Sequence, residues 1–377
     1  MAGTDAASRK PQSDYIYGID LVRFASAVSV AAFHLSWLMP GIAWLLPFGW
    51  VGVQVFFVIS GLVIANSAQG ATPIQFLSSR FLRLYPTAWC AAAVSFPLLL
   101  WEFPKMPDKL QRLYFSIILF PGPFIATAYW TLPIELAFYF LIYSLIVFKG
   151  FRHIQAIAVL LILWSAPYVV ALTLTKAGWK QWSWVDFDYL WENMSLLRYG
   201  LYFGLGILIW LFKEKRLGAV GVVFAMLAVL LGMMEIYDKT VEILPRFAYG
   251  YGALQTPWAH LATASNVAFC AAFIAILISV KLNHRFTKNA VVRKTVRLMG
   301  LTTYPFYLLH ERVGEFVIYQ LNRAGLGQLP CVIFALIAIG IVSLLIAKLA
   351  EPALRGLLKK IGAVMNPDSK KPALETP

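Results

Sequence analysis

Residues 16–39 read IYGIDLVRFASAVSVAAFHLSWLM. The stretch is long and apolar enough to cross a bilayer as one helix, yet it contains Asp20, Arg23 and His34. Ionisable side chains in hydrocarbon are costly, so they face a protein interior, pair with one another or mark a reaction path. Arg23 and His34 are eleven residues apart, and at ~100° and ~1.5 Å per residue they share one helix face, ~16 Å apart. The stretch therefore predicts a membrane protein with an ionisable site inside it.

The whole chain has the composition of an integral membrane protein. Of its 377 residues, 60% are hydrophobic and 13% are charged, and the mean hydropathy is +0.71. We predict an all-α polytopic membrane domain at 14–355, between polar tails at 1–13 and 356–377 that we expect to be disordered. About ten transmembrane helices are expected, at 16–39, 50–66, 83–101, 129–148, 154–174, 195–212, 217–234, 258–280, 298–319 and 330–350.

The Lys and Arg residues predict the orientation in the membrane. One set of alternating loops and tails holds twenty of them and the opposite set holds eight. Cytoplasmic loops carry the excess, so both termini are predicted to be cytoplasmic, which agrees with an even number of spans. The net charge of +14 then reflects topology and contact with membrane lipid, and not nucleic-acid binding. The three cysteines have neither metal-ligand spacing nor a disulfide pattern, and we expect no metal.

A carboxylate and an imidazole are expected at the same depth. Glu135, in the segment YWTLPIELAFYF (129–140), lies six residues, or ~9 Å, below the outer end of its span. His34 lies about five residues, or ~8 Å, below the outer end of the first span. A carboxylate beside an imidazole orients the ring and makes it a better base. The alternatives are a structural Glu135 bonded to a hydroxyl or the backbone, and a self-neutralising Asp20–Arg23 pair.

Three further segments contribute candidate site residues. Two arginines one turn apart open a helix at the cytoplasmic face and suit a phosphorylated ligand, with anchoring to acidic lipid as the alternative. An amide in the second span is placed to hydrogen-bond into a site, and the ninth span carries a tyrosine and a second histidine, for which an interfacial structural role is the alternative. These residues are Arg80 and Arg83 in FLSSRFLRLYP (76–86), Gln54 in GWVGVQVFFVISGLVI (49–64), and Tyr304 and His310 in LMGLTTYPFYLLH (298–310).

The segments quoted above are joined by LRYGLYFGLGI (197–207) and the closing Glu351–Pro352. Taken in chain order, this set resembles the acyltransferase-3 family of membrane acyltransferases over residues 15–355. The resemblance implies transfer of an acyl group, most often acetyl, from cytoplasmic acyl-CoA such as acetyl-CoA to a hydroxyl of an extracytoplasmic or lipid-linked glycan. It also implies a bacterial inner membrane protein. The chain departs from the family pattern at Gln54, where an acidic residue is common, and at Ser79, where an arginine is common.

The resemblance also implies roles for individual residues. His34 is similar to the family's essential histidine, Arg23 to its paired arginine, Arg80 and Arg83 to its donor-side arginines, and Glu135 to the acid of its tryptophan segment. We expect a tunnel in which the arginines hold the CoA phosphates and the thioester reaches His34. There His34 acts either as a general base or as an acyl carrier, with an oxyanion contact from Tyr304 or Gln54, and a substrate contact from His310.

A different class of function fits the same residues. A polytopic transporter or flippase for a lipid-linked or phosphorylated sugar would use the intramembrane His, Glu and Arg as a proton relay or as substrate ligands. No inverted repeat of broken helices is seen in the sequence, which weighs against it. A non-catalytic scaffold gives Arg23 and His34 no role. The sequence leaves open the acceptor and its acylated position, the acyl chain length and the oligomeric state.

Overall fold

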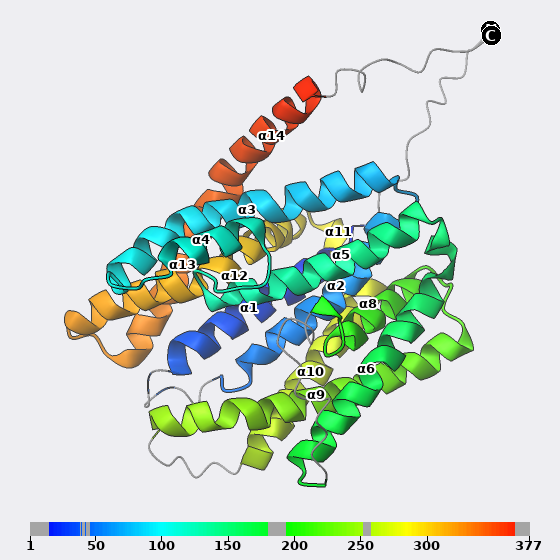
Figure 1. Ribbon diagram of the computed structural model, residues 1–377, viewed down its shortest axis with the longest axis horizontal. Helices are drawn as coiled ribbons and strands as arrows, with labels where there is room; N and C mark the ends of the chain where they lie inside the picture. Colours follow the sequence, from blue (N-terminus) through cyan, green and yellow to red (C-terminus); the bar gives the residue numbers. More distant parts are fainter. Residues whose placement is uncertain are drawn as a thin grey trace.

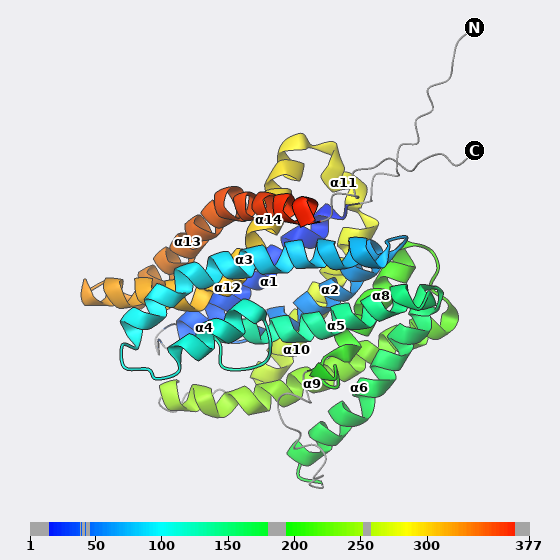
Figure 2. The same cartoon turned by 45° about the horizontal axis from the view of Figure 1, so that its top comes forward.

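The computed structural model is a bundle of long helices (Figures 1 and 2). It describes residues 15–37, 39, 42, 46–179, 194–251 and 258–365, so most of the tails predicted to be disordered lies outside the described residues. Within these ranges, ten helices correspond to the ten expected spans. They are α1 (Tyr17–Trp37), α2 (Gly52–Ala68), α3 (Pro73–Glu102), α5 (Thr131–Val147), α6 (Ile154–Lys176), α8 (Gly200–Lys213), α9 (Ala219–Tyr251), α10 (Trp258–Lys281), α12 (Ala290–Arg323) and α13 (Gln328–Leu345).

Length and composition confirm an all-α polytopic membrane protein. Eight helical segments of the described chain are long and apolar enough to cross a bilayer. The two exceptions are α8 and α12. Helix α8 has 14 residues, or ~21 Å against a hydrocarbon core of ~30 Å, and it is buried from Gly200 to Leu211. Helix α12 has 34 residues and is more polar than the others. Helix α8 lies inside the bundle, and most residues of α12 from Thr302 to Gly314 are buried as well.

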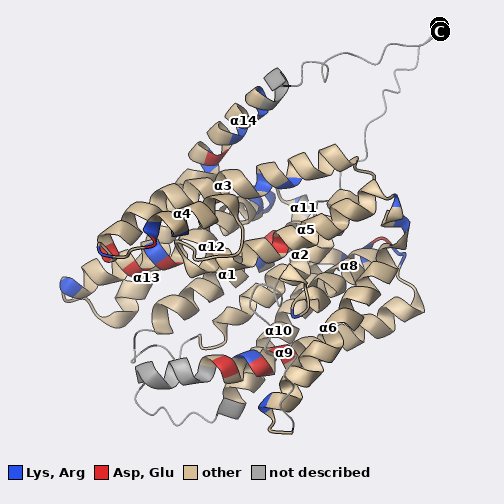
Figure 3. Cartoon of the chain, viewed as in Figure 1, with Lys and Arg blue, Asp and Glu red and all other residues tan. Residues whose placement is uncertain are grey.

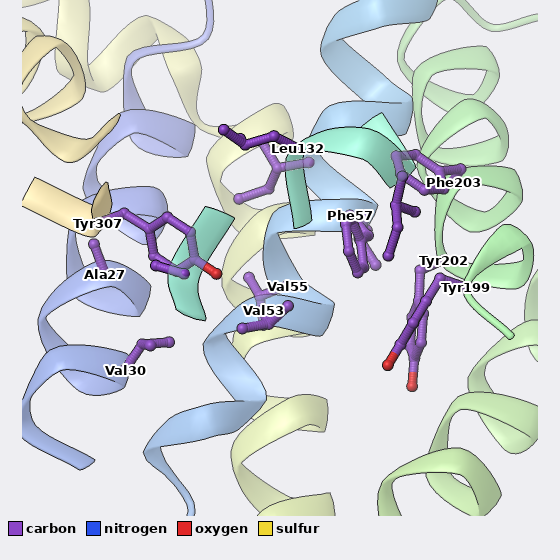
Figure 4. Packing of buried hydrophobic residues seen from close by; sticks show 14 of the residues in the cluster. Ala27, Val30, Val53, Val55, Phe57, Leu132, Tyr199, Tyr202, Phe203 and Tyr307 are labelled. Carbon is purple, nitrogen blue, oxygen red and sulfur yellow. The ribbon is translucent and has the colours of Figure 1, made fainter. Parts of the chain in front are cut away.

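Close approaches between small residues hold the centre of the bundle together. Helix α2 packs most closely on α8, and α1 on α12. A Cβ added at Gly61 would collide with the backbone carbonyl of Phe203, and one added at Gly206 with that of Val58, so α2 and α8 touch backbone to backbone. Figure 4 shows Phe57 of α2 facing Phe203 and Tyr199, at ring-centroid distances of 5.0 and 5.1 Å. Small residues of α2 and α8 thus permit the close packing of these two helices.

The contact between α1 and α12 positions the ionisable residues of the first span. A Cβ at Gly300 would collide with the carboxylate of Asp20, which accepts a hydrogen bond from the Tyr15 hydroxyl. Arg297 lies over the Tyr15 ring, with 5.1 Å between its guanidinium carbon and the ring centroid. Asp20 therefore holds the N-terminal end of α1 on α12. Among the described side chains Asp20 and Arg23 form no direct ion pair, although their charges interact electrostatically.

Shorter elements complete the chain. They are η2 (Gly49–Val51), α4 (Lys109–Ile118), η3 (Thr127–Trp130), η4 (Gly150–His153), α11 (Asn283–Lys288), the π-helical turn η6 (Ile346–Ala350) and α14 (Glu351–Met365). Pro352 has no N–H for the carbonyl of Lys348, which accounts for the irregular turn before it. Helix α14 projects from the bundle (Figure 1), and the boundary predicted at residue 356 falls within it. Its leucines and lysines recur with a helical period that the composition of the tail conceals.

Candidate active site

Two histidines from helices far apart in the sequence meet inside the bundle. Helix α1 carries His34 and helix α12 carries His310, and Nδ1 of His34 lies 2.9 Å from Nε2 of His310. The ring centroids are 5.0 Å apart and the planes differ by 19°. His310 is completely buried and His34 is partly buried. The structure thus makes His310 the direct partner of His34, and an interfacial position for His310 is excluded.

The hydrogen-bond network assigns the protons of the two rings. Nδ1 of His310 lies 2.6 Å from the backbone carbonyl oxygen of Tyr307, which can only accept, so this nitrogen carries a proton. In a neutral ring, Nε2 of His310 is then an acceptor, and Nδ1 of His34 donates to it. This leaves the lone pair of His34 on Nε2, which is the nitrogen that a general base or a nucleophile would use.

The acid beside the two imidazoles is Glu311. One ligating atom from each of His34, His310 and Glu311 lies within 4.8 Å of the other two. The Glu311 carboxylate accepts two hydrogen bonds from Thr127, one from its backbone N–H at 2.5 Å and one from its hydroxyl. Thr127 belongs to η3, directly before α5. The carboxylate is therefore fixed at the outer end of α5, next to the histidine pair.

The side chains of His34, His310 and Glu311 could also hold a cation, and the distances between them test this possibility. Two imidazole nitrogens bound to one zinc ion at ~2.0–2.1 Å in a tetrahedral arrangement would be ~3.4 Å apart. The observed 2.9 Å is a hydrogen-bond distance, and Glu311 binds Thr127. The described arrangement is that of a hydrogen-bonded acid–histidine pair, and the absence of a metal stays a prediction.

Glu135 is not beside His34, and the expected pairing of the two is wrong. The Glu135 carboxylate accepts hydrogen bonds from the hydroxyls of Tyr139, at 2.5 Å, and Ser60, at 3.3 Å. Thr127 binds Glu311, which lies beside the two histidines, so Thr127 marks their level along α5. Glu135 follows Thr127 by eight residues and therefore lies ~12 Å farther along the helix. The structural alternative, a glutamate bonded to hydroxyls, describes its contacts.

Glu135 belongs instead to a second, inner group of residues. A cavity of about 80 Å³ is lined by Arg23, Arg83, Glu135, Ser60, Tyr304 and Tyr307, among others. Two arginines and one carboxylate thus meet below the histidines, on the side where the Lys/Arg count predicts the cytoplasm. Tyr304 donates a hydrogen bond of 3.3 Å to the carbonyl of Leu84. We call this group the inner cavity.

Arg80 lies at the edge of this group. Its guanidinium carbon is 5.8 Å from the ring centroid of Phe76 and 5.9 Å from that of Tyr139, whose hydroxyl binds Glu135. One terminal nitrogen of Arg80, Nη1, is buried without a hydrogen-bond partner in the described structure. A buried donor without a partner is costly, and an anionic ligand would satisfy it.

Gln54 contributes to a different polar cluster. Its amide donates a 3.2 Å hydrogen bond to Glu235 of α9. Glu235 is completely buried, accepts from the Tyr202 hydroxyl at 2.8 Å and pairs with Arg198 at 2.8 Å. Arg198 also reaches Glu242 at 3.3 Å. The sequence prediction that Gln54 contacts substrate has no support in these contacts, which tie α2 to α8 and α9.

A larger cavity lies on the other side of the histidine pair. It has a volume of about 420 Å³, and His34 is one of its lining residues together with Trp101, Glu102, Glu315 and Tyr319. These residues come from the ends of α3 and α12 that the Lys/Arg distribution places outside. We call it the outer cavity. Among the described residues the two cavities have no lining residue in common, and a continuous tunnel between them stays a prediction.

The structure therefore brings together some predicted site residues and separates others. Arg23, Arg83, Glu135 and Tyr304 line the inner cavity, Arg80 adjoins it, His34 lines the outer cavity and His310 binds His34; Gln54 is elsewhere. Sequence reasoning missed Glu311 and Thr127. The sequence His310-Glu311-Arg312 was the available signal, because an acid next to a membrane histidine is a candidate partner.

Comparisons with known proteins show what the chain is similar to. A family profile described as an acyltransferase domain matches residues 16–348. A putative membrane-bound transacylase, BcsY, from Komagataeibacter xylinus is 27% identical over 239 residues, which are 57% of this chain and 56% of the relative. The exopolysaccharide production protein ExoZ from Rhizobium meliloti (strain 1021) is 31% identical over 103 residues, which are 24% of this chain and 32% of the relative. The matched regions thus span about half and one third of these curated relatives. No solved structure matches the chain.

Proposed function

Because the chain belongs to the acyltransferase-3 family, we propose that it transfers an acyl group, most often acetyl, from cytoplasmic acyl-CoA to a hydroxyl of an extracytoplasmic or lipid-linked glycan. Its place would be the bacterial inner membrane. The observation that carries the proposal is the pair His34–His310, backed by Glu311, between an arginine-lined inner cavity and an outer cavity. The relatives named for transacylation and for exopolysaccharide production support a glycan as acceptor.

The inner side is suited to the acyl donor. CoA is polyanionic, and guanidinium groups bind phosphates with charge-assisted hydrogen bonds. Arg83 lines the inner cavity, and Arg80 next to it has a buried nitrogen that lacks a partner. In this proposal the phosphates stay at the cytoplasmic mouth, near Arg80 and Arg83, and the thioester passes Arg23 toward His34.

The chemical step uses the free lone pair of His34. Nε2 takes the proton of the acceptor hydroxyl while the hydroxyl oxygen attacks the thioester carbon. The tetrahedral adduct collapses with cleavage of the C–S bond, and the imidazolium returns its proton to the departing thiolate. The products are an ester and the free thiol of CoA. Glu311 stabilises the positive charge that the His34–His310 pair carries while the proton is held.

A covalent route is compatible with the same residues. Nε2 of His34 would attack the thioester and release the thiol, and the acyl-imidazole would then pass its acyl group to the acceptor hydroxyl. In that route a donor-only incubation transfers one acyl group per protein. In the direct route, transfer requires both substrates at once.

The test is acyl transfer by the full chain in lipid nanodiscs. We expect thiol release from acetyl-CoA that depends on an added glycan, and an acyl increment on that glycan by mass spectrometry. His34→Gln and His310→Gln should remove both signals, whereas His153→Gln, which alters an exposed histidine in η4, should retain them. Glycan uptake or flipping without thiol release would instead establish the transporter.

A further inference from the structure

The outer cavity has the composition of a carbohydrate site. Its volume of about 420 Å³ lies within the ~300–1,000 Å³ range of small-molecule sites. The lining combines three aromatic side chains with two carboxylates and an amide, and it includes His34. A cavity that served only a lipid tail would not gather these polar groups next to the catalytic histidine.

The aromatic residues form one connected surface. The ring centroid of Trp101 is 4.9 Å from that of Phe316 and 5.1 Å from that of Tyr319, both edge to face. Trp101 and Tyr319 are 45% and 47% exposed. The Arg323 guanidinium lies over the Tyr319 ring, 5.7 Å from its centroid, so Trp101 offers the more accessible ring to a ligand. Flat aromatic faces provide a large apolar contact area for the C–H face of a sugar ring.

The charges of the cavity favour one class of sugar. Arg312 donates to Glu102 at 2.8 Å and to Glu315 at 3.2 Å through Nη1, and to the carbonyl of Ile125 at 2.8 Å through Nε. One cation therefore faces two carboxylates, and the three side chains carry a net negative charge when both carboxylates are ionised. Arg312 is not among the residues that line the cavity, whereas both carboxylates are. Their remaining oxygens can accept from hydroxyls, and they repel an anionic ligand.

We propose that the outer cavity is the acceptor subsite and that it selects a neutral or amino sugar over an acidic one. The Trp101–Phe316–Tyr319 surface carries the ring, and Glu102 and Glu315 accept hydrogen bonds from its hydroxyls. One free hydroxyl then faces Nε2 of His34. This inference rests on the proposed function for its chemistry, but the binding it describes does not require the reaction.

The competing explanation for the aromatic residues is the interfacial belt of Trp and Tyr that anchors membrane proteins. It predicts no effect of these residues on sugar binding. Trp164 of α6 gives a matched control, because it is 55% exposed and binds the carbonyl of Ser195 away from the outer cavity. Replacing either tryptophan by leucine preserves an apolar surface for lipid.

The experiment measures sugar binding by saturation-transfer NMR on the full chain in nanodiscs. The probes are methyl glucoside and methyl glucuronide, which differ in one carboxylate. We expect the glucuronide to bind about tenfold more weakly, since one uncompensated like charge at close range costs on that order. Glu315→Gln should reduce the difference to about threefold or less. Trp101→Leu should weaken glucoside binding by about tenfold, and Trp164→Leu should leave it as in the wild type.

Two results would overturn the proposal. One is equal binding of glucoside and glucuronide to the wild type, which needs no variant. The other is glucoside binding that Trp101→Leu and Trp164→Leu affect alike. Failure of the proposed function gives a different result: the wild type binds the glucoside selectively but releases no thiol from acetyl-CoA in its presence, so the sugar site stands and acyl transfer does not.

Discussion

The carboxylate of Glu311 offers the sharpest test of the site, because the sequence assigned its role to Glu135. We predict that Glu311→Gln lowers kcat strongly. At 4.8 Å and an effective dielectric constant of ~20, a carboxylate stabilises an imidazolium by about 3.5 kcal/mol. This interaction is made with the imidazolium of the transition state and not with the neutral ring of the ground state. Its loss should therefore slow the reaction by roughly 300-fold.

The assay is thiol release from acetyl-CoA by the full chain in nanodiscs, with the acceptor varied. Glu311 lines neither the inner nor the outer cavity as described, so the KM values of donor and acceptor should change little. Glu214→Gln is the matched control, because Glu214 pairs with Lys213 after α8, away from the site. Thr127→Val keeps the charge of Glu311 and removes one of its hydrogen bonds, so a loss of about tenfold or less is expected.

A catalytic role of Glu311 fails this test if Glu311→Gln retains more than one third of the wild-type kcat while the protein folds normally. It also fails if the loss lies entirely in KM, because that would make Glu311 a binding residue. A strong loss in Glu135→Gln with an intact Glu311→Gln variant would restore the assignment made from the sequence. That outcome would require a conformation in which Glu135 reaches His34.

Three other substitutions test the donor side and the bundle. Arg83→Ala should raise the KM for acetyl-CoA by roughly tenfold, as expected for one charge-assisted contact to phosphate, with kcat at saturating donor little changed. Gly206→Ala should lower stability by about 1–3 kcal/mol through collision with α2, measured as the melting temperature in detergent, whereas Gly340→Ala has open space and should be tolerated. Arg198→Met should destabilise the protein by about 3–5 kcal/mol, because it leaves the buried Glu235 without its 2.8 Å cation; removing both charges together should restore much of the melting temperature.

Hydropathy predicted the fold because membrane helices are continuous apolar segments. Each of the ten expected spans overlaps a helix of the described bundle, and several of these helices extend beyond the expected span. Helix α14 was missed because it is amphipathic and short of the length that hydropathy detects. Helix α12 was expected at 298–319, and it extends at both ends into more polar sequence, from Ala290 to Arg323.

The sequence predicted which types of residue form the site better than it predicted which of these residues are in contact. Depths counted from the ends of apolar segments placed His34 and Glu135 at one level. The position of α5 relative to the histidines is set by the hydrogen bond from Thr127 to Glu311. These two residues are far apart in the sequence, and a hydropathy profile carries no information about a polar contact of this kind. The pairing of His34 with His310 spans 276 residues, so it depends on how α1 packs against α12. Arg23 and Glu135 were each expected to act with His34, and both line the inner cavity.

The separation of the two cavities predicts what limits the acyl chain. The inner cavity of about 80 Å³ is well below the ~300 Å³ at which small-molecule sites begin, so it accepts only the end of a donor. Tyr307 closes it toward the histidines: its ring lies 5.3 Å from that of Phe56 and 5.7 Å from that of His310, and Figure 4 shows it beside α1. Figure 3 shows that charged residues are few along the helices and that some of them lie within the bundle.

Tyr307→Ala should therefore widen the passage and shift donor preference from acetyl-CoA toward butyryl-CoA. Two more buried methylenes are worth about 1.6 kcal/mol, or roughly fifteenfold in the ratio of the two kcat/KM values. Tyr143→Ala, a tyrosine of α5 outside both cavities, is the control for the loss of an aromatic ring. An unchanged butyryl-to-acetyl ratio in Tyr307→Ala, in a protein that still transfers acetyl, would mean that the acyl group reaches His34 by a path that does not pass this residue.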